Sequence, residues 1–182
     1  MLLIDCDLRR PSLADKLPLK KTNGLSDFLA GQSGTENLIQ LCGIKGDERA
    51  FHAIAPGRIP PNPMELLSSA RMEKMLEQLR GSYDYIILDL PPVGEVGDAL
   101  AIAKLTDGIL MVVRQNLCDR VALNTAIRQF EFVDAKLLGV VFNCTREGGA
   151  GYGRGYFGSY YRKYYRQYYG ERKTTRTKKA KK

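Results

Sequence analysis

Several features that would define a functional class are scarce or missing in this sequence. No run of apolar residues approaches the roughly 18 needed to cross a membrane, so we expect no membrane span. Acidic and basic residues stand among the first eleven positions, which a secretory signal peptide does not tolerate. The four cysteines are far apart and form no CxxC pair, so we interpret them as reduced, mostly buried thiols of a cytoplasmic protein. The single histidine, His52, lies in an apolar run, and we expect it to be structural.

The 182 residues are 44% hydrophobic and 26% charged, which allows one domain with a sizeable core. The net charge of +8 is unevenly distributed. Tyr152–Lys182 contains 11 Lys and Arg against one acid, Glu171, a charge of +10, which leaves −2 for residues 1–151. Eight of the ten tyrosines also lie in this final segment. The basic character therefore belongs to a tail and not to the globular part.

Short apolar runs alternate with segments of helical spacing along residues 1–147. Runs rich in apolar residues predict strands at 2–5, 51–55, 85–88, 108–113 and 138–142. Apolar residues at helical spacing predict helices over 22–30, from an N-cap at Asn62 to Leu79, and over 119–132. Nearly all-apolar strands that alternate with helices indicate an α/β fold with a parallel sheet and helices on both faces.

Carboxylates follow two of the predicted strands. Asp5 and Asp7 stand at the end of the first strand, and Asp89 at the end of another. Ligands of open parallel sheets bind at the carboxyl ends of the strands, and converging carboxylates suit Mg²⁺. The alternative is that each acid only terminates a strand or caps a helix. Two acidic strand ends, one followed by Arg-Arg-Pro and one by Pro-Pro, favour the functional interpretation.

The motifs around these acids resemble those of a known family. Leu2–Pro11 (LLIDCDLRRP) resembles the Walker A′ motif of the bacterial tyrosine kinases, the BY-kinases of capsule and exopolysaccharide export. Ile86–Pro92 (IILDLPP) is similar to their Walker B strand, with Leu90 where Thr is usual. Gly57–Leu67 (GRIPPNPMELL) and Asp98-Ala99 also match. The related ParA/MinD ATPases share the two Walker-like strands, so the specificity comes from the combination with the tyrosine cluster.

One motif of that family is absent. No GxxxxGK[ST] phosphate loop occurs in the sequence, and Met1 stands directly before the A′ strand. The resemblance thus implies a P-loop NTPase-like sheet whose N-terminal strand–P-loop–helix unit is missing. We expect residues 1–147 to be a partial P-loop kinase domain, arising as a fragment, a split gene or a misplaced start. We also expect this chain to be inactive alone.

The resemblance assigns roles around ATP and Mg²⁺. Asp5 would accept or orient the proton of the substrate Tyr hydroxyl, while Asp7 and Asp89 would hold the metal. Arg9 would pair with phosphate or would balance the neighbouring acids, and both interpretations stay open. Asn143 and Arg146 correspond in position to the adenine-contacting residues of the family, although an Asn at a strand end is more often a turn former.

The Gly-, Tyr- and Arg-rich segment 148–170 resembles the family's autophosphorylation cluster, and 171–182 is expected to be a disordered basic tail. By composition alone, a nucleic-acid or polyanion-binding module is an equal alternative. A ParA/MinD-like ATPase is a third hypothesis. The expected phosphorylation sites are Tyr152, Tyr156, Tyr160, Tyr161, Tyr164, Tyr165, Tyr168 and Tyr169.

The resemblance implies a protein-tyrosine kinase that regulates capsule or exopolysaccharide synthesis and export. Its expected partners are neighbouring kinase subunits, phosphorylated in trans, and the cytoplasmic end of a membrane polysaccharide co-polymerase that activates it. Nucleic acid is not expected as a partner. The expected location is the cytoplasm, at the inner face of the plasma membrane, reached through that partner or a missing N-terminal region.

Overall fold

The computed structural model describes residues 1–20, 23–43 and 50–145. Met1–Cys144 forms one compact unit. Arg146, the tyrosine cluster and the basic end, for which disorder was expected, lie outside the described residues. No helix among the described residues is both long and apolar enough to cross a membrane.

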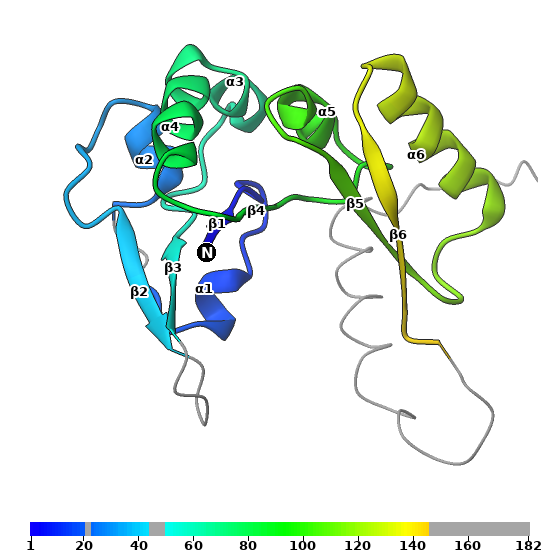
Figure 1. Cartoon of the computed structure of the whole chain (residues 1–182), viewed down its shortest axis with the longest axis horizontal. Helices are drawn as coiled ribbons and strands as arrows, with labels where there is room; N and C mark the ends of the chain where they lie inside the picture. The colour runs from blue at the N-terminus through cyan, green and yellow to red at the C-terminus, as the bar shows by residue number, and fades with distance from the viewer. Residues whose placement is uncertain (21–22, 44–49, 146–182) are drawn as a thin grey trace, which may run out of the picture. The chain divides into compact units, whose positions relative to one another are not determined.

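Helices and strands alternate along the described chain (Figure 1). In order they are β1 (Leu2–Asp5), α1 (Leu13–Lys16), α2 (Leu25–Leu29), β2 (Ile39–Gly43), β3 (Ala50–Ile54), α3 (Pro63–Leu67), α4 (Ala70–Arg80), β4 (Ile86–Asp89), α5 (Asp98–Ala103), β5 (Ile109–Arg114), α6 (Arg120–Phe132) and β6 (Leu137–Asn143). The five strands predicted from apolar runs are all present within about one residue of their expected bounds.

The first sheet has four strands in the order β2-β3-β1-β4. The central strand β1 pairs in parallel with β3 and with β4, as the α/β prediction requires. The outer strand β2 runs antiparallel to β3 and was not predicted. Its residues carry little signal because only Cys42 is buried while Leu41 is 70% exposed, the pattern of a short edge strand.

A second sheet consists of β5 and β6, which pair in parallel with a register shift after Ile109. Among the described residues β5 pairs with no strand of the first sheet. The sequence predicted one parallel sheet, and the α/β class is confirmed, but its strands fall into two groups here.

Helices pack on both faces of the four-stranded sheet, as predicted. Leu2 and Ile4 point to one face, where they form a buried cluster with side chains of α2, α3 and α4. Leu3 and Ala53 point to the other face, where Ala14 of α1 and the following Leu17 and Leu19 cover them. The alternation within β1 sends neighbouring side chains to opposite faces, so this strand is buried from both sides.

The helix predicted from Asn62 to Leu79 is in fact two helices. α3 ends at Leu67, and α4 begins at Ala70 after Ser69, whose Oγ accepts a hydrogen bond from the Met72 N–H at 3.2 Å. The prediction of one continuous helix was wrong because the two adjacent serines bond to the backbone and so compete with helical pairing. Asn62 occupies the N-cap position, but its Nδ2 donates to Glu65 Oε2 at 2.7 Å instead of its oxygen capping the backbone.

Two remaining sequence expectations concern single side chains. Cys6 and Cys42 are buried, but Cys118 and Cys144 are exposed, so the expectation of mostly buried thiols holds for half of them. Cys118 immediately precedes the N-cap of α6, and Cys144 directly follows the end of β6. His52 lies in β3 with its Nδ1 2.9 Å from the Tyr83 hydroxyl, which fits the structural role expected of it.

Candidate active site

Two of the three candidate carboxylates stand side by side at the carboxyl ends of parallel strands. Asp5 of β1 is in register with Asp89 of β4, and the next residue, Cys6, donates its N–H to the Asp89 carbonyl at 2.8 Å. Both side chains therefore leave the sheet on the same face, because paired residues in register point the same way. The convergence expected from the sequence is present in the structure.

Asp5 is fully buried and is held by the segment that follows it. Its Oδ2 accepts a hydrogen bond from the Leu13 N–H at 3.1 Å, and its Oδ1 one from the Asp7 N–H at 3.2 Å. Burial raises the pKa of Asp5 to about 6, with smaller upward contributions from the charges of Asp89 and Asp7, although the two backbone hydrogen bonds oppose the shift. Asp5 is thus a carboxyl group that titrates close to neutral pH.

Asp7 shapes the turn after β1. Its Oδ1 accepts hydrogen bonds from the N–H groups of Arg9 at 3.2 Å and Arg10 at 2.9 Å, and the residue is 8% exposed. A carboxylate that binds backbone donors two and three residues ahead is a typical Asx-type turn. The structural interpretation of an acid that terminates a strand therefore applies to Asp7. A metal-binding role for Asp7 stays a prediction.

Asp89 is the exposed member of the group. Protein atoms around its carboxyl group raise the pKa of Asp89, and the negative charge of Asp7 adds to the rise, while Lys16 of α1 opposes it. The charges of Asp5, Asp7 and Asp89 thus influence one another at the end of the β1–β4 pair. A cation would relieve this mutual repulsion.

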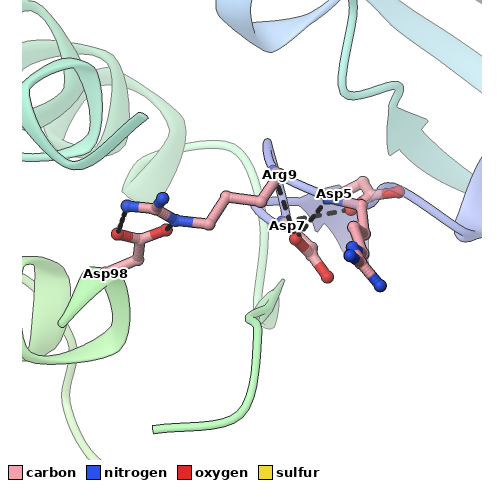
Figure 2. Close-up of polar contacts among 5 residues, drawn as sticks. Asp5, Asp7, Arg9 and Asp98 are labelled. Atoms are coloured by element: carbon pink, nitrogen blue, oxygen red, sulfur yellow. Dashed lines mark hydrogen bonds and ion pairs between the residues drawn. The ribbon is translucent and has the colours of Figure 1, made fainter. Parts of the chain in front are cut away.

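Arg9 reaches away from these acids to a different element. Figure 2 shows its side chain extending from the turn after β1 to Asp98, the first residue of α5. The Arg9 Nε donates to Asp98 Oδ2 at 2.7 Å and Nη2 to Oδ1 at 3.0 Å, a bidentate pair. Asp98 has no solvent exposure, and the Arg9 side chain is 35% exposed. The guanidinium therefore neutralises Asp98, an acid 89 residues away, which neither sequence-based interpretation of Arg9 included.

Asn143 ends β6 and forms a turn there. Its Oδ1 accepts the N–H of Cys144 at 2.7 Å, and its carbonyl accepts the N–H of Gln115 at 3.0 Å. This geometry fits the alternative in which a strand-ending Asn is a turn former. β6 pairs only with β5 among the described strands, so strand pairing does not bring Asn143 to Asp5 and Asp89. Its contact with adenine stays a prediction, and Arg146 lies outside the described residues.

The chemistry of the acidic group suits a magnesium ion. The described residues contain no cluster of three or more His, Cys, Asp or Glu side chains arranged to hold a metal by themselves. Mg²⁺ usually takes only one or two carboxylates from the protein and completes its shell with water and phosphate oxygens. Asp7 and Asp89 could supply two such oxygens, and their mutual repulsion suits a cation at this end of the sheet.

A second polar network, not foreseen from the sequence, fixes the loop after β3 to α2. The buried Asp27 accepts the Nε of Arg58 at 2.6 Å and the N–H of Gly24 at 3.2 Å. Gly57 has a φ of +82°, and a Cβ there would lie 2.6 Å from the Asp27 carboxylate. The GRIPPNP segment is thus held in place at its start. The sequence signal for this network was the Gly57-Arg58 pair, but Asp27, the acid that Arg58 binds, lies 31 residues earlier in the chain.

Comparison with known proteins finds relatives that are named tyrosine-protein kinases. The chain is 33% identical over 153 residues to the tyrosine-protein kinase CpsD of Streptococcus agalactiae serotype III (strain NEM316), covering 84% of this chain and 64% of CpsD. It is 33% identical over 143 residues to the tyrosine-protein kinase YwqD of Bacillus subtilis, covering 79% of this chain and 59% of YwqD. The chain belongs to the bacterial tyrosine kinase family.

Solved structures agree with this family assignment. The structure superposes on the kinase domain of the Escherichia coli tyrosine kinase ETK with a TM-score of 0.75 at 33% sequence identity, covering 85% of this chain and 60% of that domain. The BceF tyrosine kinase domain gives a TM-score of 0.67 at 34% identity. No protein-family model matches the chain. The chain spans less than two thirds of the length of CpsD and of YwqD.

Proposed function

We propose that this chain carries part of the active site of an ATP-dependent protein-tyrosine kinase that phosphorylates its own C-terminal tyrosine cluster. The observation that carries the proposal is the register of Asp5 with Asp89 at the carboxyl ends of parallel strands, with Asp7 two residues beyond. Three mutually interacting carboxylates at that edge suit a bound Mg·ATP, and relatives at 33% identity are named tyrosine-protein kinases.

Asp7 and Asp89 would hold the magnesium ion, and the ion would supply charge neutralisation for the phosphates. Asp89 is exposed and can meet a ligand directly, whereas Asp7 is held by backbone donors and would act through water. Phosphoryl transfer depends mainly on positioning and electrostatics, so these two carboxylates need do no covalent chemistry.

Asp5 would accept or orient the proton of the substrate tyrosine hydroxyl. A pKa of about 6 leaves it mostly ionised at pH 7 while keeping useful basicity. Its carboxylate is fully buried and is bonded by the Leu13 N–H, so a substrate hydroxyl reaches it only when the segment after β1 shifts. Arg9 would contribute by fixing that segment to α5 through Asp98, and its direct pairing with phosphate stays a prediction.

The eight tyrosines between Tyr152 and Tyr169 would be the substrate, presented to the site of a neighbouring subunit. The basic residues among them would pair with phosphate once it is attached. The process would be regulation of capsule or exopolysaccharide synthesis and export. The activating partner would be the cytoplasmic end of a membrane co-polymerase, which would place the kinase at the inner face of the plasma membrane.

The purified chain would bind nucleotide weakly and show little or no kinase activity. Its 182 residues contain no GxxxxGK[ST] loop, whose backbone N–H groups and Lys hold phosphates in P-loop proteins. Isothermal titration with Mg·ATP measures this directly. Micromolar binding by the purified chain would show that the acidic edge holds nucleotide without such a loop.

A phosphotyrosine blot of the full-length protein taken from its host tests the kinase assignment. We expect a signal for the wild type, its loss in Asp5→Asn and Asp89→Asn, and its retention in Asp84→Asn, which changes an exposed acid just before β4. A gel shift with random nucleic acid is the counter-test for the basic tail. Strong, salt-dependent nucleic-acid binding without phosphotyrosine would overturn the kinase assignment and favour a polyanion-binding module.

A further inference from the structure

The loops that follow β1 and β4 start side by side and are joined again at an ion pair. Their first points, Asp5 and Asp89, are in register at the ends of the two strands. The loop after β1 then reaches Arg9, and the loop after β4 reaches Asp98, where the guanidinium meets the carboxylate (Figure 2). The two loops that carry the candidate acids are thus connected by strand pairing at one end and by the Arg9–Asp98 pair at the other.

Asp98 is the fixed partner of this pair, because the helix that it begins is packed firmly. Ile102 of α5 has no exposure and lies in one apolar cluster with Leu67 of α3. A Cβ on Gly97, directly before the helix, would lie 3.6 Å from the Met64 sulfur of α3. The Asp98 side chain has no exposure either, so it has no room to follow a guanidinium that moves.

Arg9 is the link between this fixed point and the Asp7 carboxylate. The Asp7 Oδ1 accepts the N–H of Arg9 at 3.2 Å and that of Arg10 at 2.9 Å, so the carboxylate and the backbone of Arg9 hold each other. The two hydrogen bonds of 2.7 and 3.0 Å to Asp98 fix both the direction and the reach of the Arg9 side chain. A shift of Arg9 would therefore move the Asp7 carboxylate relative to Asp89 on the neighbouring strand.

We propose that Asp98 is a positioning residue of the magnesium site: through Arg9 it fixes the turn that carries Asp7, and so sets the separation of the Asp7 and Asp89 carboxylates. The inference rests on the proposed function, because it takes these two acids to hold the ion. Mg²⁺ demands a nearly ideal octahedral shell, whereas Ca²⁺ tolerates irregular ones, so a fixed separation favours the smaller ion. Arg9 then has a role that requires no contact with phosphate.

An effect of charge alone predicts a different result from loss of positioning. Arg9→Ala removes a positive charge from the neighbourhood of the acids, which by Coulomb attraction alone would tighten the binding of a cation. Asp98→Ala removes a negative charge and would weaken it. Loss of positioning weakens binding in both variants, and to the same extent in the double variant, because all three lack the same link. The sign of the change in Arg9→Ala therefore separates the two explanations.

The main experiment titrates the 182-residue chain with Mn²⁺ as a reporter ion, followed by electron paramagnetic resonance, with no nucleotide present. Competition by Mg²⁺ and by Ca²⁺ then gives the affinity for each ion. Residues that orient metal ligands from outside usually matter 10- to 100-fold, so Mg²⁺ should bind about tenfold more weakly to Arg9→Ala, to Asp98→Ala and to the double variant. Ca²⁺ affinity should fall less, so the preference for Mg²⁺ should narrow. Arg80→Ala, which breaks the exposed pair with Asp107, is the matched control and should change neither affinity.

Hydrogen exchange followed by NMR shows where the variants act. The amide of Arg10, which is bonded to Asp7, should exchange faster in Asp98→Ala relative to the amide of Leu25, whose bond to the Ala55 carbonyl lies in the core. A general loss of stability would accelerate both amides alike. In the wild type, bound Mn²⁺ should broaden the amide signals of Asp7 and Leu90 most strongly, and this measurement needs no variant to fold.

Several results would overturn the positioning role. Equal Mg²⁺ affinities in the wild type and Asp98→Ala would do so, and so would tighter binding by Arg9→Ala, which is the result of charge alone. Signals of Asp7 and Leu90 that Mn²⁺ leaves sharp in the wild type would show that no ion binds between the two loops.

The kinase assignment can fail separately from the positioning role. Metal binding that depends on Asp98, with no phosphotyrosine in the full-length protein from its host, would retain the positioning role and reject the kinase. Phosphotyrosine in the host, with metal affinities that Asp98→Ala leaves unchanged, would retain the kinase and reject the positioning role.

Discussion

The Arg9–Asp98 pair offers the sharpest test of how the turn after β1 is held. Replacing Arg9 by Ala leaves the Asp98 carboxylate without exposure and without the two hydrogen bonds of 2.7 and 3.0 Å that it now accepts. Replacing Asp98 by Ala leaves a guanidinium that is already 35% exposed and can turn to water. The two single substitutions should therefore differ in cost, with Arg9→Ala the more damaging.

The magnitude follows from the burial of each partner. Removing one partner of a fully buried ion pair costs about 3–5 kcal/mol, and an exposed pair contributes about 0–1 kcal/mol. With one partner buried and the other partly exposed, Arg9→Ala should cost about 2–3 kcal/mol of the free energy of unfolding. Asp98→Ala should cost about 1–2 kcal/mol, because only the hydrogen bonds and the helix N-terminal charge are lost.

The assay is urea unfolding followed by circular dichroism for the wild type, both single variants and the double variant. The cycle should give a coupling free energy of about 1–2 kcal/mol between the two side chains. Arg80→Ala is the matched control, since its partner Asp107 is 90% exposed at 3.0 Å, and it should cost no more than about 1 kcal/mol. Costs of Arg9→Ala and Asp98→Ala that add within about 0.3 kcal/mol would refute the pairing.

Three further predictions concern other parts of the chain. Burial tends to raise the pKa of Asp27, but hydrogen bonds from Arg58 and Gly24 outweigh this effect and lower the pKa below 3.8. The stability that ionised Asp27 contributes is therefore complete above about pH 5 and is lost as pH falls through the pKa of the folded state. The difference in urea midpoint between the wild type and Asp27→Asn should therefore shrink below pH 4; a constant difference would contradict this sign. Gly57→Ala should cost about 1–3 kcal/mol in the same assay, because φ is +82° and the new Cβ would meet Asp27, whereas Gly43→Ala, with open space around it, should cost less than about 1 kcal/mol. Each phosphotyrosine adds about −1.5 to −2 charges, so about five to seven phosphotyrosines would cancel the +10 of residues 152–182. In size-exclusion chromatography, the phosphorylated full-length kinase should therefore elute closer to the position of a monomer. An unchanged oligomer would argue against a charge switch.

The acids of the candidate site could be predicted because their position depends on local features. An apolar run followed by Asp marks a strand end, and the carboxyl ends of parallel strands share one edge, so Asp5 and Asp89 were expected together. The partners of the arginines could not be predicted. Asp98 lies 89 residues from Arg9, and Asp27 lies 31 residues from Arg58, and nothing in the local sequence indicates which acid each guanidinium will meet.

In the secondary structure too, some elements could be predicted from the sequence and others could not. The apolar strands were recognisable because burial from both faces requires an unbroken apolar run. β2 was missed because an edge strand with one buried residue has no such run. The break between α3 and α4 was missed because Ser68 and Ser69 are tolerated within helices, and only their bonding to the backbone shows that the helix stops there.

The sequence by itself determined the strand–helix alternation, the acidic strand ends, the absence of a phosphate loop and the separation of a −2 domain from a +10 tail. These follow from residue type and spacing along the chain. Only the tertiary structure decided that LLID is buried while IILD is half-exposed, and that Arg9 pairs with Asp98. It also decided that, within the described part of the chain, β4 pairs with β1 alone and β5 with β6 alone. The physical reason is that burial and ion pairing depend on which elements are neighbours in space, and two nearly identical strands differ once one has a partner on each side and the other does not.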